Sequence, residues 1–564
     1  MMHPVVKVAR GISNTIVFAC VIGLVTAVAS HYFRAGINYL SKFSNQFLSE
    51  LSSFLFYFIS LSFAAVLVYL IQKYGKIPRF EGPADSIYSA HRVDNELNIK
   101  YGLLSTIAAF ISASGGASVG QYGPLVHFGA TIGAWLKSTS KSTITTDVFI
   151  GCGVAAAISS GFGAPIAGVI FAHEAVTRHF AFKAIAPISI SSGIAFLGSQ
   201  YFWPIDPPFD STGYGNIESL SSTIISSVFV APMFGLGAIV FMKSVEKLQS
   251  VNQRLRTNRF YNTFAAICCL SLIGVYVPEV LGLGTEIVAN TINQQYSLLI
   301  LILLLFGKLL ATSISLSFGF FGGVFSPALF IGATLGAISA HILNAAGIVN
   351  LSAAEMSICG MAAVSGAVIG APLTAVLIVI ELTQSYFLGL STLVSVVIAV
   401  MVCDVSYGHS FFDRQLAKRG IDISNGRTGL ILMETSVTKY ISTDMLTLGV
   451  DTLKSVAFAE MTKRKTTEGY LIEKNGKLVG KISILDLINQ AENEYCIDIA
   501  DRTPFSLDRD ASLQQAIEAA SQFVGEAIPV IDLESQILIG TITEGDILNA
   551  YLTVQDQIID LEKK

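Results

Sequence analysis

The sequence predicts an all-α polytopic membrane protein with internal repeats and broken helices, followed by a smaller α/β domain in water. Three observations support this fold class. Of the 564 residues, 52% are hydrophobic and only 13% are charged, with a mean hydropathy of +0.62. Charge is unevenly divided along the chain. Two pairs of glycine-rich segments also recur at a nearly constant spacing.

The uneven charge separates two regions of the chain. Residues 430–564 contain 22 acidic and 12 basic residues, whereas residues 1–429 contain 18 acidic and 23 basic residues. A segment that crosses lipid excludes charge, and a domain in water carries it. We therefore expect a membrane domain over residues 1–425 and a soluble domain after it.

The N-terminal sequence predicts an uncleaved first span. Lys7 and Arg10 precede the apolar run Thr15–Ala29, and no cleavage site is convincingly placed. We expect the protein to be an integral membrane protein with both termini in the cytoplasm. The short N-terminus indicates the bacterial inner membrane. The seven cysteines lie mostly in apolar runs without a CxxC pair, so neither a disulfide framework nor a metal site is expected. No nucleic-acid partner is expected either.

Two pairs of segments indicate an internal duplication. GQYGPLVHFGATIGA at 120–134 matches GVFSPALFIGATLGA at 323–337, and GVAAAISSGFGAPIAGVIFAHE at 153–174 matches GMAAVSGAVIGAPLTAVLIVIE at 360–381. We expect repeat halves at about 15–210 and 215–415, in inverted orientation. Apolar segments such as Leu125–Leu136 are shorter than the ~20 residues of a full span, which predicts half-helices. Their end groups need protein, water or an ion as partner.

The segments that begin at Gly120 and Gly323 predict an anion site. Each has glycine, an aromatic residue and then proline where a helix would start. A helix start presents free N–H groups and the positive end of the helix dipole, which together favour an anion. Close helix packing is the alternative explanation for the glycines. Tyr122 would stand at the mouth of such a site.

The motifs GQYGP, GFGAPIAGVIFAHE and GGVFSPALFIGATLG, in this order, resemble the CLC family of chloride channels and chloride/proton exchangers over about residues 15–420. The resemblance implies a homodimer with one anion pathway per subunit, chloride as the transported ion and no required cofactor. It also implies that the N–H groups of Val324 and Phe325 line a central anion site, and those around Gln121, Tyr122 and Gly123 an outer one.

The acidic residues depart from the family pattern. Tyr122 stands where the family typically has its gating glutamate, and Ala175 follows Glu174 where exchangers have a second acid. A phenol with a pKa of about 10 can donate to an anion but carries protons poorly near neutral pH. We therefore expect Tyr122 to be the gate, by contacting the anion or plugging the pathway. Simple packing against Phe325 is the alternative. Glu174 and Glu81 are the possible acid sites.

The expected inner end of the pathway also departs from the family. Aligning Pro83 with the motif proline places Phe80, Glu81 and Gly82 in the loop that usually bears a serine, and Phe412 replaces the usual pore tyrosine. Two hydroxyl donors are therefore missing. Glu81 could repel anions, act as a substitute gate or be a solvated loop acid.

The C-terminal region contains two similar units, at 436–498 and 499–560. Each is expected to form a strand, a helix and a strand–turn–strand that ends in Gly-x-Ile-[Ser/Thr]-x-x-Asp. They resemble a tandem CBS pair. The resemblance implies ribose contacts of a possible adenine nucleotide from four residues, Ser483, Asp486, Thr543 and Asp546. The acidic charge of this region opposes a polyphosphate, and a dimer-forming scaffold is the alternative.

These features predict a passive chloride channel or uncoupled anion transporter of the CLC type, modulated or scaffolded by its CBS domains. An atypical proton-coupled exchanger is the main alternative, and a non-conducting membrane sensor the second. An enzyme is not expected. The HEAVTRH segment starts like a zinc protease helix, but His173 and His179 are six residues apart and do not share a helix face.

Overall fold

The computed structural model describes residues 4–47, 51–92, 94–140, 142, 144–178, 182–203, 217–255, 258–347, 351–423, 426–488 and 494–563. Contacts divide the chain into two compact units, Met1–Ile421 and Asp422–Lys564. This division lies four residues before residue 425, the expected end of the membrane domain.

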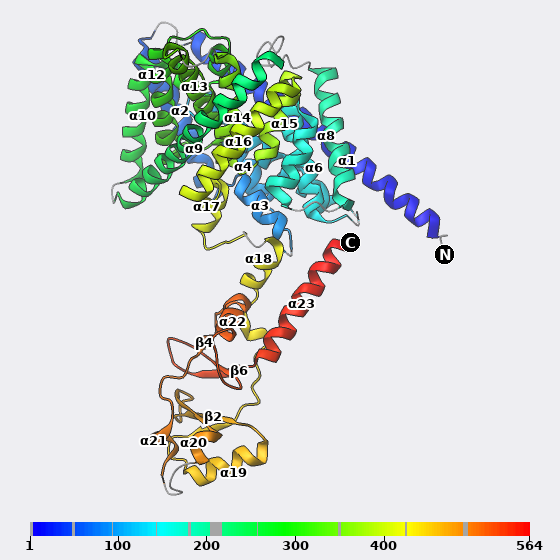
Figure 1. The fold of residues 1–564 in the computed structure, drawn as a ribbon, viewed down its shortest axis with the longest axis vertical. Helices are drawn as coiled ribbons and strands as arrows, with labels where there is room; N and C mark the ends of the chain where they lie inside the picture. The colour runs from blue at the N-terminus through cyan, green and yellow to red at the C-terminus, as the bar shows by residue number, and fades with distance from the viewer. Residues whose placement is uncertain are drawn as a thin grey trace. The chain divides into compact units, whose positions relative to one another are not determined.

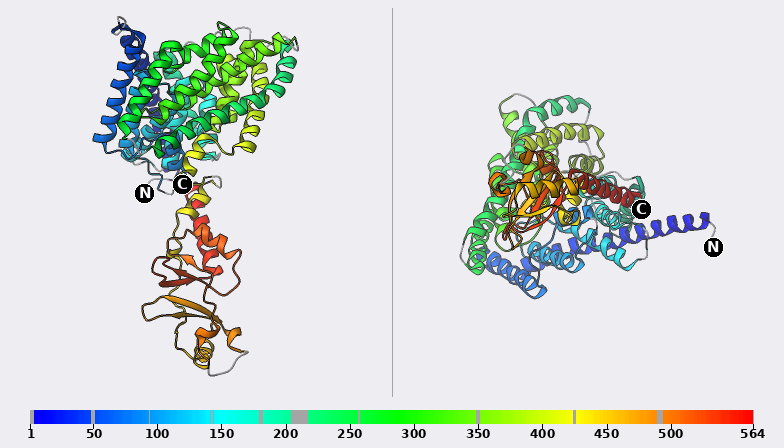
Figure 2. Two further views of the ribbon diagram at one scale, coloured as in Figure 1. Left: turned by 90° about the vertical axis from the view of Figure 1, so that its left-hand side faces the viewer. Right: turned by 90° about the horizontal axis from the view of Figure 1, so that it is seen from below.

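The described part of the first unit consists of helices and contains no strand (Figures 1 and 2). The first half of this unit forms α1 (Pro4–Phe47), α2 (Ser53–Gly75), α3 (Pro83–His91), α4 (Ile99–Ser114), α5 (Tyr122–Thr139), α6 (Thr146–Phe162), α7 (Pro165–Phe171), the π-helical turn η1 (Ala172–Thr177) and α8 (Phe182–Phe202). The second half forms α9 (Ile217–Arg254), α10 (Arg259–Tyr276), the 3-10 turn η2 (Pro278–Val280), α11 (Thr285–Ile292), α12 (Leu298–Ser317), α13 (Phe325–Ala345), α14 (Ala353–Ile369), α15 (Pro372–Thr383), α16 (Tyr386–Ser406) and α17 (Phe411–Ala417).

Among the described residues, seven helical segments are long and apolar enough to cross a membrane, and five apolar helical segments are shorter. A 17-residue helix such as α6 rises only about 26 Å, less than the ~30 Å of a hydrocarbon core. The prediction of a polytopic helical membrane protein with short, broken helices is therefore confirmed.

Glycines bring equivalent helices of the two repeats into backbone contact. α5 packs on α6, and α13 packs on α14. A Cβ atom on Gly153 would lie 1.9 Å from the Gly129 carbonyl oxygen, and one on Gly360 would lie 2.4 Å from the Gly332 oxygen. In the repeated segments of the sequence, Gly129 corresponds to Gly332, and Gly153 corresponds to Gly360. Close packing therefore explains these particular glycines.

We expect Gly153→Ala to destabilise the first unit by about 1–3 kcal/mol or more, because the added methyl group would meet backbone atoms that cannot move independently. Thermal unfolding of the purified protein in detergent measures this loss. Gly193→Ala in α8 is the matched control, because a Cβ atom there meets nothing within 4 Å. Equal stability of the two variants would contradict the packing explanation.

The second unit contains two three-stranded sheets of the same topology. In each, the first strand is parallel to the second, and the second is antiparallel to the third. The strands are β1 (Thr447–Gly449), β2 (Glu468–Ile472), β3 (Leu478–Ser483), β4 (Leu507–Asp508), β5 (Ile528–Ile531) and β6 (Leu538–Ile542). The helices are α18 (Gly426–Glu434), the 3-10 turn η3 (Val437–Lys439), α19 (Lys454–Arg464), α20 (Ile484–Ile488), α21 (Cys496–Ile499), α22 (Leu513–Ala520) and α23 (Glu544–Lys563).

The predicted strand–helix–strand–strand order of each unit is therefore confirmed. Val437 and Tyr440, at the start of the first predicted unit, pack into the hydrophobic core formed mainly by the second, around Leu513 and Val530. Each sheet ends with its Gly-x-Ile motif on the last strand.

Candidate functional site

A short antiparallel bridge joins the starts of α5 and α13. Gly120 N–H donates to the Gly323 carbonyl oxygen at 2.7 Å, and Gly323 N–H donates to the Gly120 oxygen at 2.8 Å. A Cβ atom on Gly120 would lie 2.7 Å from the Gly323 oxygen, so glycine is required for this approach. The bridge brings the two helix starts predicted from the sequence side by side.

The first N–H groups of both helices lack a protein acceptor. Within the described ranges, no hydrogen bond to a protein acceptor is formed by the backbone N–H groups of four predicted site residues, Tyr122, Gly123, Val324 and Phe325. The N–H group of Gln121, in contrast, donates to Ser326 Oγ at 3.2 Å. Buried N–H groups are normally paired, and leaving one unpaired costs about 1–3 kcal/mol. Two adjacent helix starts are thus free to bind an anion.

A third helix start lies beside them. α3 begins at Pro83, whose Cγ would lie 3.6 Å from a Cβ atom on Gly123. This start differs electrically from the other two, because Gly82 N–H donates to Asp85 Oδ2 at 2.9 Å. Its positive end is therefore partly neutralised by a carboxylate of its own helix.

The loop before α3 also contacts the loop before α13. The Phe80 ring centroid lies 5.0 Å from that of Phe321, and a Cβ atom on Gly82 would lie 3.9 Å from Phe321 Cζ. Phe80 is partly buried. The structure thus places Phe80 and Gly82, two of the predicted inner-loop residues, next to the loop that leads into α13.

Tyr122 belongs to a cluster of three aromatic rings. Its ring stacks on Phe162 at a centroid distance of 3.8 Å and an interplanar angle of 21°. The Phe325 ring is 5.7 Å away, edge to face, and lies 5.3 Å from Phe162. Phe325 is buried, whereas Tyr122 remains partly exposed. Tyr122 is therefore the more exposed of these two residues, and it stands at the first position of α5.

Two residues of this site were not predicted from the sequence. Phe162 ends α6 within the GFGAP motif. Arg34, on α1, donates to the carbonyl oxygens of Ser160 and Gly161 at 3.0 and 3.1 Å, and its charge acts on the Tyr122 phenol. Arginine at this depth of an apolar helix is costly unless paired or functional. An isolated Arg34 after the apolar run Thr15–Ala29 is the signal that could have found it.

Phe412 lies apart from the aromatic cluster. It is buried on α17, and its ring neighbour is Phe411 at 6.2 Å. None of the ring contacts among the described residues joins it to Tyr122 or Phe325. α17 does pack on α3, so Phe412 belongs to the surroundings of the inner loop.

The paired glutamates Glu174 and Glu381 cap helices of the opposite repeat. Glu174 accepts hydrogen bonds from Leu373 N–H and Thr374 N–H at 2.8 Å each and from Thr374 Oγ1 at 2.7 Å, at the start of α15. Glu381 accepts from the N–H groups of residues 166 and 167 at 2.9 and 2.8 Å, at the start of α7. A carboxylate at a helix start is stabilised by the helix dipole. These contacts give both acids a structural role. Among the starts of α5, α7, α13 and α15, they leave those of α5 and α13 without a carboxylate acceptor.

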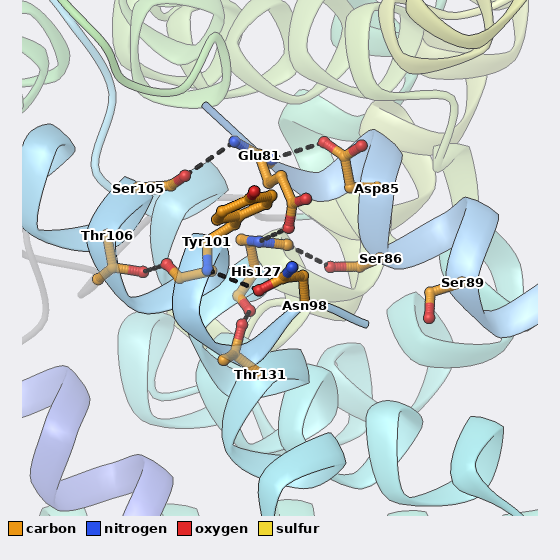
Figure 3. A network of polar contacts seen from close by, with 12 residues as sticks. Glu81, Asp85, Ser86, Ser89, Asn98, Tyr101, Ser105, Thr106, His127 and Thr131 are labelled. Atoms are coloured by element: carbon orange, nitrogen blue, oxygen red, sulfur yellow. Dashed lines mark hydrogen bonds and ion pairs between the residues drawn. The ribbon is translucent and has the colours of Figure 1, made fainter. Parts of the chain in front are cut away.

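Glu81 belongs to a network of polar contacts that is shown in Figure 3. Its N–H donates to Ser105 Oγ at 2.8 Å, and its Oε2 lies 3.8 Å from Nε2 of His127 on α5. Glu81 lies between α2 and α3, outside the candidate spans. Burial, together with the charge of Asp85, raises the pKa of Glu81 to about 7, although Arg79 and Arg419 oppose this. Glu81 is therefore an acid whose charge changes near neutral pH.

The comparisons with known proteins agree with this architecture. The sequence model of the family described as "Voltage gated chloride channel" matches residues 63–404, which is more than half of the chain. The chain belongs to this family, the CLC family. A "CBS domain" model matches residues 496–553. The predicted membership and the CBS-type fold of the C-terminal region are therefore confirmed.

Three CLC relatives place the chain within the family. The "H(+)/Cl(-) exchange transporter ClcA" of Vibrio parahaemolyticus is 25% identical over 443 residues, covering 72% of this chain and 91% of that protein. A structure of a slow cyanobacterial Cl-/H+ antiporter has a TM-score of 0.61 and 25% identity, covering 74% of this chain and all of that one. A eukaryotic CLC transporter, at 16% identity and a TM-score of 0.61, covers 95% of this chain and 98% of its own and shows the shared fold.

In the C-terminal unit of this CLC chain, the four predicted ribose contacts are placed at two helix starts. Ser483 N–H donates to Asp486 Oδ2 at 2.9 Å, and Thr543 N–H donates to Asp546 Oδ2 at 3.0 Å. Both aspartates thus cap their own turns. Thr543 also lines a pocket of about 370 Å³. Within the described residues, no three His, Cys, Asp or Glu side chains are grouped as a metal site.

Proposed function

We propose that the membrane unit is a passive anion pathway, conducting chloride as a channel or as an uncoupled transporter. The unpaired N–H groups at the adjacent starts of α5 and α13 are the observation that carries this proposal. Each such end favours a negative charge by typically 0.3–1 kcal/mol, and up to about 2 kcal/mol when partly buried. A site built from partial charges holds an anion without the tight binding that a fixed cation would cause.

The side chains at the site support an uncoupled pathway. Tyr122, a phenol, stands at the first position of α5, and Glu174 is followed by Ala175. The Glu174 carboxylate already accepts three hydrogen bonds at α15, so releasing it to carry protons would leave those donors unpaired. We therefore propose Tyr122 as the gate and Glu174 as a helix cap.

Proton-coupled exchange is the second candidate. It is favoured by the names of the relatives, which describe chloride/proton exchangers, and by Glu81, an acid near the free helix starts. A non-conducting membrane sensor is the third. The family resemblance supports a homodimer with one pathway in each subunit. We also propose a bacterial inner-membrane location with cytoplasmic termini, and the bacterial organisms of the relatives are consistent with a bacterial membrane.

For the C-terminal unit, we propose a modulating or scaffolding role, with an adenine nucleoside as the possible ligand. The pocket that includes Thr543 is also lined by Asp444, Glu468 and Glu526, with Arg464 as its cation. This charge balance disfavours a polyphosphate. The neutral nucleoside part of an adenine nucleotide matches this acidic pocket better than its phosphate groups do.

Reconstitution in liposomes tests the proposed function. We expect chloride efflux that dissipates an imposed chloride gradient, with no proton uptake against a proton gradient, because no coupled acid lies at the gate. A chloride electrode and a pH electrode in the same vessel measure both ions, and liposomes without protein give the background. Proton uptake driven by chloride would establish the exchanger instead, and absence of flux at all pH values would favour the sensor.

A further inference from the structure

Glu81 and His127 form a pair of titratable side chains that is separate from the aromatic gate. Glu81 Oε2 lies 3.8 Å from His127 Nε2, and Figure 3 shows the two side chains directed toward each other. His127 is only 1% exposed, and its other ring nitrogen, Nδ1, lies 2.8 Å from Ser86 Oγ. The hydroxyl therefore fixes the ring, with Nε2 aimed at the carboxylate.

Both facing atoms lack any other partner. Among the described residues, neither Glu81 Oε2 nor His127 Nε2 has a hydrogen-bond partner, although both are buried. At 3.8 Å the two atoms are too far apart for a hydrogen bond, but close enough to form one after a small rotation of a side chain. A buried carboxylate oxygen and a buried ring nitrogen that face each other form a site at which one added proton can be held by either residue.

Asp85 and the charged side chains on the elements packed against α3 already have partners. Asp85 accepts hydrogen bonds from Arg79, at 2.5 and 3.1 Å, and from Arg419, at 2.8 Å. On the elements packed against α3, Arg178 is bonded to Asp413, and the remaining acid of η1, residue 174, caps α15. The nearby phenol of residue 101, on α4, completes the polar surroundings in Figure 3. These ion pairs therefore do not compensate a change of charge at Glu81 and His127, and the exposed Glu96 is the remaining acid of the adjoining pocket.

The pair connects solvent with the anion site. On one side, Glu81 lines an open pocket of about 370 Å³ together with Arg79, Asp85 and Glu96. On the other side, His127 follows Tyr122 by five residues on α5, a rise of about 7.5 Å. A proton can reach the pair from water, and its charge lies near the free helix starts.

We propose that Glu81 and His127 together bind one proton, and that binding this proton speeds the passage of the anion. The inference rests on the proposed anion pathway and adds its regulation by pH. Without the proton the pair carries one negative charge, which repels an anion at the helix starts. With the proton the pair is neutral, whichever residue holds it, and the carboxyl–imidazole contact can close into a hydrogen bond. The raised pKa of Glu81, about 7, places this change near neutral pH.

The pH profile of chloride efflux from liposomes tests the proposal. We expect the wild-type rate of chloride efflux to rise about tenfold from about pH 8.5 to about pH 5.5. This factor corresponds to removing one negative charge at roughly 10 Å from the anion, with an effective dielectric constant of about 20. Glu81→Gln mimics the neutral acid, so it should be fast at every pH. His127→Gln removes one partner and should shift the midpoint. Glu96→Gln, which changes an exposed acid of the same pocket, should keep the wild-type profile.

The outcomes separate this inference from the proposed function. A pH-independent wild-type flux, or a Glu81→Gln profile that matches wild type, would overturn the inference and leave the anion pathway intact. If Glu81→Gln fails to fold, an unshifted midpoint in His127→Gln overturns the inference by itself. Absence of chloride flux at every pH would instead overturn the proposed function.

Discussion

Replacing Tyr122 with alanine is expected to raise chloride efflux about tenfold. In the proposed pathway, an ion that passes the free helix starts displaces the phenol ring, which is stacked on Phe162 and meets the edge of Phe325. Aromatic pairs of this kind contribute about 0.5–1.5 kcal/mol each beyond their burial, and about 1.4 kcal/mol corresponds to a tenfold rate. The initial rate of efflux from liposomes with equal protein content measures the change.

Tyr122→Phe is the matched control for this experiment. It keeps the ring stack and removes only the hydroxyl group, so the rate should stay close to wild type. A change in the relative rates of chloride and bromide in this variant would indicate that the hydroxyl contacts the ion. An alanine variant with the wild-type rate would show that the ring does not obstruct the pathway.

Replacing Glu381 with alanine is expected to destabilise the membrane unit by about 1–3 kcal/mol, because the N–H groups of residues 166 and 167 at the start of α7 lose a charged acceptor. Glu174→Ala should have an effect at least as large, since that carboxylate accepts three hydrogen bonds. The fraction of protein that remains monodisperse after heating in detergent, measured over a temperature series, reports the loss.

Glu286→Ala is the control for these two substitutions. Glu286 is exposed in the first turn of α11, so its replacement should change stability by less than about 0.5 kcal/mol. Wild-type stability in the Glu174 variant, accompanied by an altered pH profile of flux, would contradict the capping role and favour a proton carrier at that position.

The sequence was sufficient to predict the helix starts but not their surroundings. Local signals such as glycine, an aromatic residue and proline determine where α5 and α13 begin, and the repeat spacing shows that the two are equivalent. The contacts of Arg34 with residues 160 and 161 join positions more than 120 apart in the chain, and they depend on how α1 packs against α6. No local pattern records such a contact.

The glutamates illustrate the same limit. In the sequence, Glu174 and Glu381 stand at matched positions, as the last residues of the second pair of repeated segments. That each carboxylate caps a helix of the other repeat follows only from the folded arrangement. The Nε2 atom of His127, directed at Glu81, became apparent only from the geometry.

The reciprocal caps also affect biogenesis. Residue 166 and its acceptor Glu381 are 215 positions apart, so the first repeat leaves the ribosome with both its acid and its helix start unsatisfied. At roughly 5–20 residues per second, the complementary repeat follows about 10–40 s later. During that interval the nascent chain depends on the insertion machinery, or on water retained within the bilayer, to shelter these groups. A truncated first repeat should therefore be a substrate for membrane proteases.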